Sequence, residues 1–244
     1  FKQMNFQWGE YQLDECQQRI LQYTIAGKNI FLTGSAGTGK SLLLRHIIHV
    51  LQIAYTEPYQ LAITAPTGIA SFPLGGYTLH SWAGLEPNST NYPVPELVKN
   101  IRTRKHLLNH WRKVKVLIID EVSLVSPILL EKLDGIAKII RRSEKPFGGI
   151  QVIACGDFLQ LPPIRENDSE QRFCFEHPIW NQLFQNNIYC LQRVYRSIDE
   201  EWTRVLDELR TAELSPETRV LLKSRIKSSS NELQGIRLFP RRKQ

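Results

Sequence analysis

The sequence predicts an α/β fold, in which a central and mostly parallel sheet carries helices on both faces. Five short apolar runs are rich in Val, Ile and Leu and show no polar alternation, as expected for parallel strands buried on both faces. Segments with helical spacing lie between these runs, which is the order of elements in a doubly wound sheet. The predicted strands are Ile30–Thr33, Leu61–Ala65, Val116–Ile119, Val152–Cys155 and Ile188–Leu191.

The predicted helices follow from capping residues and from apolar side chains at helical spacing. Asp14 is a good N-cap for a helix through about Ala26. Between Pro127 and Arg142 the apolar residues recur on one side, as in an amphipathic helix. Further helices are predicted at 41–52, 202–210 and 216–226, polar loops at 86–95 and 165–171, and a linker at 227–231.

Composition and charge set bounds on the kind of protein. The chain has 244 residues, of which 42% are hydrophobic and 23% charged, and this suits one large domain or one domain with part of a second. No apolar run approaches the roughly 20 residues that a membrane-spanning helix needs, so no membrane partner is expected. The net charge of +7 suits an anionic partner such as nucleic acid, or a merely solubilising surface, and basic residues gather at 102–106, 141–142 and 241–243.

The four cysteines do not form a metal-binding or disulfide pattern, because none lies in a CxxC pair or at ligand spacing from a histidine. A reducing compartment is the expectation for such a chain. Cys155 and Cys190 lie in apolar runs and are predicted to be small buried side chains.

A glycine-rich segment matches the phosphate-loop pattern G-x-x-x-x-G-K-[S/T] in full, between a predicted strand and a predicted helix. Backbone amides of such a loop surround the phosphates of ATP, and the helix N-terminus adds partial positive charge. Lys40 would bring a full charge to the β- and γ-phosphates, and the Ser41 hydroxyl would bind Mg²⁺. The predicted nucleotide-binding residues of the loop are Gly34, Ser35, Ala36, Gly37, Thr38, Gly39, Lys40 and Ser41.

Two acidic residues end the third predicted strand, at the carboxyl edge where open α/β sheets bind ligands. Asp120 would hold the Mg²⁺ shell, and Glu121 would orient or deprotonate the attacking water. After the fourth predicted strand, Gln160 is suited to sensing the γ-phosphate or the attacking water, and a structural turn with a solvated Gln is the alternative for that segment. After the fifth, Arg196 would stabilise transition-state charge, with Arg193 as the competing candidate.

Seven segments in this order resemble the motifs of a superfamily-one DNA helicase: LDECQQRIL, GSAGTGKS, APTGIAS, TLHSWAG, LIIDEVS, GDFLQLPPI and LQRVYRS. Residues 131–151 (EKLDGIAKIIRRSEKPFGGIQ) are similar to the signature of the petite-integration-frequency (PIF-type) helicases, relatives of the bacterial RecD-like group. The resemblance covers roughly residues 10–226. It implies a RecA-like P-loop NTPase fold, ATP and Mg²⁺, and 5′-to-3′ unwinding along single-stranded DNA.

The resemblance also assigns residue roles. Gln17 would recognise adenine. The backbone of single-stranded DNA would be held by Thr67, Gly68, His80 and Ser81. Phe72 would stack on a base, a contact worth about 1–3 kcal/mol, and Trp82 is either a second stacking residue or part of the core. Functions of the family include DNA repair, replication, recombination and telomere maintenance, with G-quadruplexes and forked DNA among the substrates.

The resemblance implies two RecA-like motor domains in the complete helicase. Residues 1–231 correspond to the first, and 232–244 to the start of a truncated second, so the fragment is expected to bind nucleotide but to hydrolyse it slowly. A nucleotide-dependent nucleic-acid-binding module without translocation is the alternative function. A small-molecule kinase is disfavoured, because GDFLQLPP and residues 131–151 would have no role in it. The implied location is the nucleus or mitochondrion of a eukaryote, or a viral or bacterial cytoplasm.

Overall fold

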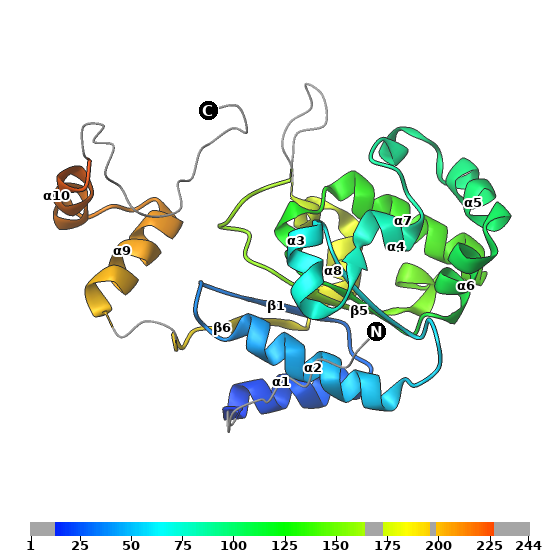
Figure 1. The fold of residues 1–244 in the computed structure, drawn as a ribbon, viewed down its shortest axis with the longest axis horizontal. Coiled ribbons are helices and arrows are strands. Elements are labelled where there is room, and N and C mark those ends of the chain that lie inside the picture. The colour runs from blue at the N-terminus through cyan, green and yellow to red at the C-terminus, as the bar shows by residue number, and fades with distance from the viewer. Residues whose placement is uncertain (1–12, 164–172, 196–198, 227–244) are drawn as a thin grey trace. The chain divides into compact units, whose positions relative to one another are not determined.

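A six-stranded sheet with the order β3-β2-β4-β5-β1-β6 forms the centre of the chain, and every neighbouring pair is parallel (Figure 1). The computed structural model describes residues 13–163, 173–195 and 199–226. The α/β fold predicted from the sequence is therefore confirmed. The strands are β1 (Ile30–Gly34), β2 (Leu61–Ala65), β3 (Tyr77–Thr78), β4 (Val116–Ile119), β5 (Gln151–Cys155) and β6 (Ile188–Leu191).

Helices connect the strands and cover the sheet. The α-helices are α1 (Glu15–Ile25), α2 (Lys40–Ala54), α3 (Gly68–Ser71), α4 (Leu79–Ala83), α5 (Val94–Thr103), α6 (Lys105–Lys113), α7 (Pro127–Arg141), α8 (Pro178–Phe184), α9 (Glu200–Thr211) and α10 (Pro216–Ser224). The 3₁₀ turns are η1 (Phe72–Leu74), η2 (Ser89–Asn91), η3 (Val122–Leu124), η4 (Pro146–Gly149) and η5 (Cys174–Glu176).

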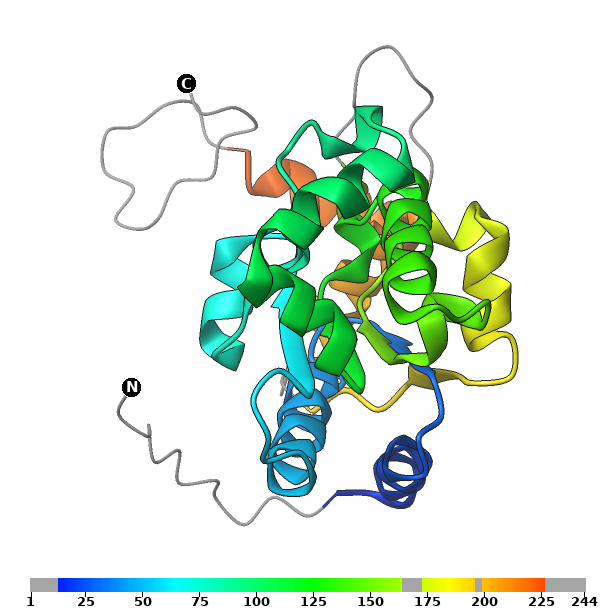
Figure 2. The same cartoon turned by 90° about the vertical axis from the view of Figure 1, so that its right-hand side faces the viewer.

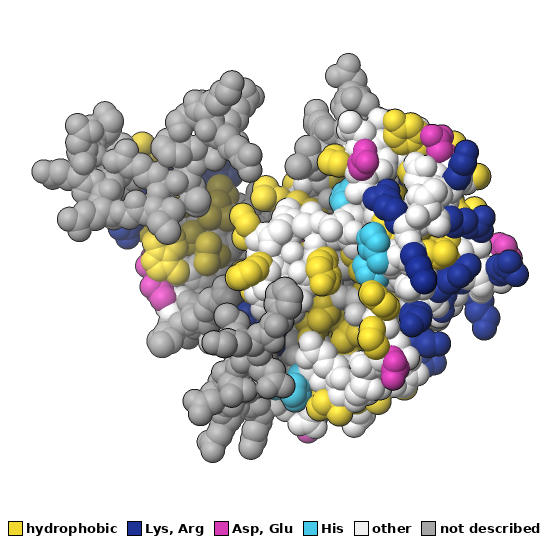
Figure 3. Space-filling model, turned by 45° about the vertical axis from the view of Figure 1, so that its right-hand side comes forward, with side chains coloured by type: hydrophobic (Ala, Val, Ile, Leu, Met, Phe, Trp, Pro, Cys, Tyr) yellow, Lys and Arg dark blue, Asp and Glu magenta, His cyan; other side chains and the backbone are white. Residues whose placement is uncertain are grey.

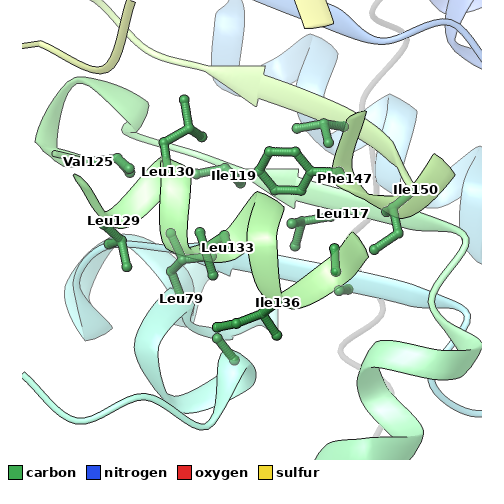
Figure 4. Close-up of a cluster of buried hydrophobic side chains, with 14 of the residues drawn as sticks. Leu79, Leu117, Ile119, Val125, Leu129, Leu130, Leu133, Ile136, Phe147 and Ile150 are labelled. Atoms are coloured by element: carbon green, nitrogen blue, oxygen red, sulfur yellow. The ribbon is translucent and has the colours of Figure 1, made fainter. Parts of the chain in front are cut away.

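The four central strands, β2, β4, β5 and β1, are buried on both faces, and each face of the sheet packs into its own core. In β4, Val116 and Ile118 belong to the core beneath α1 and α2, whereas Leu117 and Ile119 belong to the larger core beneath α4–α8. This division follows from the alternation of side chains along a strand. Figure 2 shows the two helical layers on opposite sides of the sheet, and Figure 4 shows α7 side chains such as Leu133 and Ile136 in the larger core.

The segment that resembles the PIF-type signature acts as a structural brace. Oδ1 of Asp134 accepts a hydrogen bond from the Phe147 backbone amide at 2.6 Å, and Oδ2 lies 2.7 Å from the Lys138 ammonium group. The Arg141 guanidinium donates to the carbonyl of Gly148 at 2.9 Å and to that of Val114 at 3.0 Å. These bonds tie α7 to η4 and to the end of α6, so the signature fixes the positions of these elements.

Several local predictions are corrected by the structure. Cys155 is buried as predicted, but the prediction for Cys190 is wrong, because β6 is an edge strand and exposes that side chain. The two-residue strand β3 and the helices α5, α6 and α8 were not predicted. The predicted loop at 86–95 contains η2, and α5 already begins at its end, at Val94. The predicted loop at 165–171 and linker at 227–231 lie outside the described residues.

The chain divides into two compact units, Phe1–Ile198 with the sheet and Asp199–Gln244 with α9 and α10. In the second unit, a Glu208 oxygen accepts hydrogen bonds from the Ser215 amide and hydroxyl, both at 2.8 Å, and so fixes the turn between the two helices. The predicted domain boundary after residue 231 falls outside the described residues and stays a prediction. Among the described residues, the helices are too short or too polar to cross a membrane.

Candidate functional site

The predicted ATP-site motifs meet at the carboxyl edge of the sheet. β4, β5 and β1 are neighbours, and their carboxyl ends lead into the acid pair, the Gly156-Asp157 turn and the phosphate loop. The Gly156 amide donates to the Leu32 carbonyl at 3.1 Å, and a Cβ at Gly156 would lie 2.9 Å from the Val122 amide nitrogen. A side chain at Gly156 would therefore push the acid-pair segment away from the Gly156-Asp157 turn.

The lysine of the phosphate loop hydrogen-bonds to the backbone of its own loop. The Lys40 ammonium group donates to the carbonyls of Gly34 at 2.8 Å and Ser35 at 2.9 Å. The Thr38 hydroxyl, which is buried, also donates to the Ser35 carbonyl at 2.8 Å. Phosphate oxygens are stronger acceptors for an ammonium group than these carbonyls, because they carry charge. Lys40 therefore lies where it can exchange loop carbonyls for a nucleotide's phosphates.

Asp120 and Glu121 lie close enough to Lys40 to interact with its charge. Burial raises the pKa of the Asp120 carboxyl, while the hydrogen bond from the Glu121 amide and the Lys40 charge oppose that rise. Burial also raises the pKa of Glu121, and the neighbouring Asp120 charge adds to it. Glu121 has φ +50°, a left-handed conformation that costs a non-glycine residue on the order of 1 kcal/mol. At this end of β4, the carboxyl groups of two adjacent residues both interact with the Lys40 charge.

The acid pair has a buried thiol beside it that the sequence did not single out for this role. The Cys155 thiol at the end of β5 donates a hydrogen bond to Asp120. Burial raises the pKa of Cys155 well above its usual value, so the group stays a neutral donor. The adjacency of β4 and β5 explains the contact, and no local sequence signal marks it.

Gln160 is held by an acid in its own turn. Its side-chain amide donates to Oδ2 of Asp157 at 3.2 Å, and its backbone amide donates to the Asp157 carbonyl at 3.0 Å. Asp157 is buried, and its charge contributes to the raised pKa of Glu121. Gln160 therefore lies in the turn after β5, at the same sheet edge as the acid pair. Asp157 is a positioning residue for Gln160, and the short spacing between the two in GDFLQ could have revealed it.

The segment predicted to recognise adenine packs against the phosphate loop. Gln17 is fully buried, and its side-chain amide nitrogen has no hydrogen-bond partner within the described part of the chain. A Cβ on Gly39, which has φ +89°, would lie 3.1 Å from that nitrogen. A buried unpaired donor is costly, and an acceptor on a nucleotide base would satisfy it. The fit of Gln17 to a base is thus supported by its orphaned amide.

Tyr195 connects this segment to the loop, a role that the sequence did not predict. Its hydroxyl donates to Oδ2 of Asp14 at 2.7 Å, and its backbone amide donates to the Gly37 carbonyl at 2.8 Å. The Arg193 guanidinium lies over the Tyr195 ring, 4.9 Å from its centre. A pocket of about 480 Å³ opens here, lined by Asp14–Cys16, Thr38, Cys190–Arg193 and Tyr195. Arg193 therefore lies at this pocket, while Arg196 lies outside the described residues and its role stays a prediction.

The residues predicted to contact DNA follow β2 and β3 at the same edge of the sheet. Thr67 caps α3 and accepts a hydrogen bond from the Ala70 amide at 3.3 Å. Phe72 is 81% exposed, so its ring is free to stack. Thr67, Gly68 and Ser81 are also exposed, and His80 is half-buried.

Trp82 does not belong to this exposed group. It is 5% exposed and packs on Trp111, with ring centres 4.7 Å apart. The structure therefore assigns Trp82 to the core and leaves Phe72 as the stacking candidate.

The donor set at the acid pair suits Mg²⁺ better than a softer metal. Ser41 at the start of α2 and Asp120 at the end of β4 offer a hydroxyl and a carboxylate, and Mg²⁺ takes one or two such oxygens together with phosphates and waters. Within the described ranges, no cluster of three or more His, Cys, Asp or Glu residues could hold a metal ion.

Comparison with known proteins agrees with this arrangement. The family model described as PIF1-like helicase matches residues 12–215. The ATP-dependent DNA helicase PIF1 of Emericella nidulans is 44% identical over 231 residues, which cover 93% of this chain and 31% of that protein. The chain thus spans about a third of the length of this relative.

Two solved structures share the fold. The Pif1 helicase from Candida albicans superposes with a TM-score of 0.80 at 40% identity, covering 91% of this chain and 49% of that one. The Pif1 helicase from Bacteroides in complex with ADP-AlF3 and single-stranded DNA superposes with a TM-score of 0.71 at 28% identity, covering 91% of this chain and 52% of that one. The matched family model covers most of the chain, including every motif that meets at the sheet edge, and the chain therefore belongs to the PIF1-like helicase family.

Proposed function

We propose that this chain is the first motor domain of an ATP-dependent 5′-to-3′ DNA helicase. One observation carries the proposal. The phosphate loop, the acid pair and the segments with Phe72 and the other predicted DNA contacts all follow strands at the same edge of one parallel sheet. The nucleotide residues follow β1, β4 and β5, and the DNA residues follow the adjacent β2 and β3. This proximity is what coupling between hydrolysis and movement requires.

At the nucleotide, the chain's own residues would divide the work. Lys40 would leave the carbonyls of Gly34 and Ser35 for the β- and γ-phosphates. Glu121, whose raised pKa makes it a better proton acceptor than an ordinary glutamate, would orient and deprotonate the attacking water. Gln160, held by Asp157, would contact the water or the γ-phosphate. Mg²⁺ bound near Ser41 and Asp120 would supply positive charge to the phosphates.

On the DNA side, Phe72 would stack on a base while the hydroxyls of Thr67 and Ser81 bind backbone phosphates. Such contacts hold a strand without reading its sequence, as a translocating motor needs. Single-stranded DNA is the proposed track, and forked DNA and G-quadruplexes are proposed substrates of the complete protein. Arg196 is proposed to contribute charge stabilisation at the γ-phosphate.

The experiment is nucleotide titration of the chain carrying Lys40→Ala, with Lys28→Ala as the control. Lys28 is an exposed lysine after α1 that precedes β1, at the opposite end of that strand from the phosphate loop. Lys40→Ala should abolish binding of ATP with Mg²⁺ and leave the thermal midpoint nearly unchanged, because the lysine donates to the Gly34 and Ser35 carbonyls of its own loop. Equal ATP affinity of the Lys40→Ala and Lys28→Ala variants would contradict the assignment of Lys40 to the nucleotide site.

The alternative function, a binding module that does not translocate, is separated by a second measurement. The complete gene product should hydrolyse ATP faster with single-stranded DNA and should separate a forked duplex. Nucleotide-dependent DNA binding without strand separation would favour the binding module.

A further inference from the structure

The positive charge of this chain is concentrated in one short segment. Residues 97–119 contain seven Lys and Arg residues and no Asp or Glu. The rest of the chain therefore holds 24 Lys and Arg, which is 31 less seven, against 24 Asp and Glu, so its formal charge is zero. The whole net charge of +7 thus belongs to residues 97–119, which contain most of α5, all of α6 and the residues that lead into β4.

All seven of these side chains are exposed and available. Within the described ranges none of them forms an ion pair, and Lys113 alone makes a ring contact, 5.9 Å from the centre of Tyr59. Figure 3 shows Lys and Arg side chains gathered on one side of the molecule. The seven residues, here called the basic ridge, are Lys99, Arg102, Arg104, Lys105, Arg112, Lys113 and Lys115.

The ridge has a fixed position beside the proposed DNA track. The Trp111 indole donates to the Ala83 carbonyl at 3.1 Å, and a His110 ring nitrogen lies 3.2 Å from the Trp82 carbonyl oxygen. These contacts dock α6 on α4, the helix that carries His80 and Ser81. Within the part of the chain that the structure describes these seven cations have no ion-pair partner, so they repel one another, and a bound polyanion would relieve that repulsion.

We propose that the basic ridge binds the phosphate backbone of duplex DNA, as a surface separate from the single-strand track. Lys105 and Arg112 lie seven residues apart on one face of α6, about 10 Å along its axis. A duplex of that length carries roughly six phosphate charges, enough to engage several of the cations at once.

Duplex is favoured over single-stranded DNA because the segment that carries the ridge presents no exposed aromatic residue of its own for stacking. Residues 97–119 carry no exposed Phe, Tyr or Trp, since Trp111 on α6 is fully buried, and the neighbouring Tyr59 ring is already in contact with Lys113. Single-strand surfaces combine basic grooves with stacked aromatics, whereas a duplex grip needs only backbone contacts. The track around Phe72 has the exposed ring that the ridge lacks.

The experiment measures affinity of the 244-residue chain for a blunt duplex of about 20 base pairs and for an oligothymidine of the same length, by fluorescence anisotropy across a salt series. The test variant is Arg102→Gln with Lys105→Gln. The matched control, Arg19→Gln with Lys28→Gln, removes two exposed charges on and after α1. Lys99→Gln with Arg104→Gln is a second test variant, with the same expected result.

The two-charge test variant should flatten the slope of log affinity against log salt by about 1.8, since each duplex phosphate contact contributes about 0.9. Wild type should accordingly lose about 12-fold more duplex affinity than the variant between about 50 and 200 mM salt. The control should keep the wild-type slope, and oligothymidine binding should change much less than duplex binding.

An unchanged duplex slope would overturn the proposal, and so would an equal change in the control pair. Equal losses on duplex and oligothymidine would overturn the assignment to duplex. Loss of binding to phosphatidylserine vesicles with duplex binding intact would assign the ridge to a membrane surface instead. This inference goes beyond the ATP site, since Lys40→Ala should leave duplex affinity unchanged while the ridge variants leave nucleotide affinity unchanged.

Discussion

The hydroxyl of Tyr195 donates a 2.7 Å hydrogen bond to a carboxylate oxygen of Asp14, across a sequence separation of 181 residues. Asp14 is also the N-cap of α1, where it accepts from the Gln17 amide at 2.8 Å. Because the Tyr195 amide holds the Gly37 carbonyl, one residue ties the adenine segment to the phosphate loop. A nucleotide entering the site meets two segments that are already fixed relative to one another.

Tyr195→Phe removes this hydroxyl and keeps the ring beneath Arg193. The variant should lose about 1 kcal/mol of stability, which corresponds to roughly 2–4 °C in Tm for a chain of this size. Its Kd for ATP should rise, because the two segments must then be ordered on binding. Thermal melting and nucleotide titration check both effects, with Tyr92→Phe on an exposed tyrosine as the control. Wild-type values in both assays would contradict the coupling.

The same bond predicts a dependence on pH. The Tyr195 hydroxyl, followed by the Gln17 amide, lowers the pKa of Asp14 below its usual value. The stabilisation is therefore complete above the unfolded-state pKa of the aspartate and is lost as pH falls through the folded-state pKa. The difference in Tm between wild type and Tyr195→Phe should be constant near neutrality and should shrink in acid. A difference that grows on acidification would contradict this sign.

Glu121→Gln should stabilise the nucleotide-free protein while it abolishes turnover. Burial, followed by the Asp120 charge, raises the pKa of Glu121, so the folded state loses stability as pH rises from the unfolded-state pKa through the folded one. A neutral amide avoids this cost, and a gain of about 1 kcal/mol would raise Tm by roughly 2–4 °C. Hydrolysis should fall by on the order of 10²- to 10⁴-fold.

The control for that substitution is Glu57→Gln, which changes an exposed carboxylate far from the acid pair. Melting at neutral pH and ATPase assays of the complete protein give the two readouts, and nucleotide titration should show binding retained. A lowered Tm in Glu121→Gln would show that the carboxylate is not under electrostatic strain.

Phe72→Ala should weaken binding of single-stranded DNA without destabilising the fold. The side chain is 81% exposed, so its removal leaves no cavity. Loss of one stacked base should cost about 1–3 kcal/mol, which is roughly 5- to 150-fold in Kd. Tyr92→Ala, at an aromatic residue that is 49% exposed, is the matched control. An oligothymidine Kd equal to wild type would remove Phe72 from the track.

Much of the nucleotide site could be predicted from the sequence, because its motifs are local. The phosphate loop, the acid pair and the Gln160 segment each follow a buried strand, and the predicted ranges for β2, β4 and β6 match the observed ones. Helices α5 and α6 escaped prediction because neither begins with a side-chain cap. Their first turns follow Pro93 and Arg104, and no side-chain hydrogen bond caps either one.

Contacts between distant segments could not be predicted in the same way. Cys190 is exposed because β6 lies at the edge of the sheet. The apolar run around Cys190 predicts a strand but does not indicate where that strand lies in the sheet. The bonds from Tyr195 to Asp14 and from Cys155 to Asp120 join segments that only the tertiary fold brings together. The assignment of Trp82 to the core also required the neighbouring helix α6.

The hydrogen bonds of Arg141 also stabilise the chain segment that connects the basic ridge to the acid pair. Only Val114 and Lys115 separate α6 from β4, and Arg141 donates to the Val114 carbonyl, so the connection between the cationic helix and the strand that ends at the acid pair is braced. If a polyanion bound to the basic ridge changes the affinity for nucleotide, nucleotide must change the affinity for the polyanion by the same factor. Calorimetric titration with both species, added in either order, measures that factor.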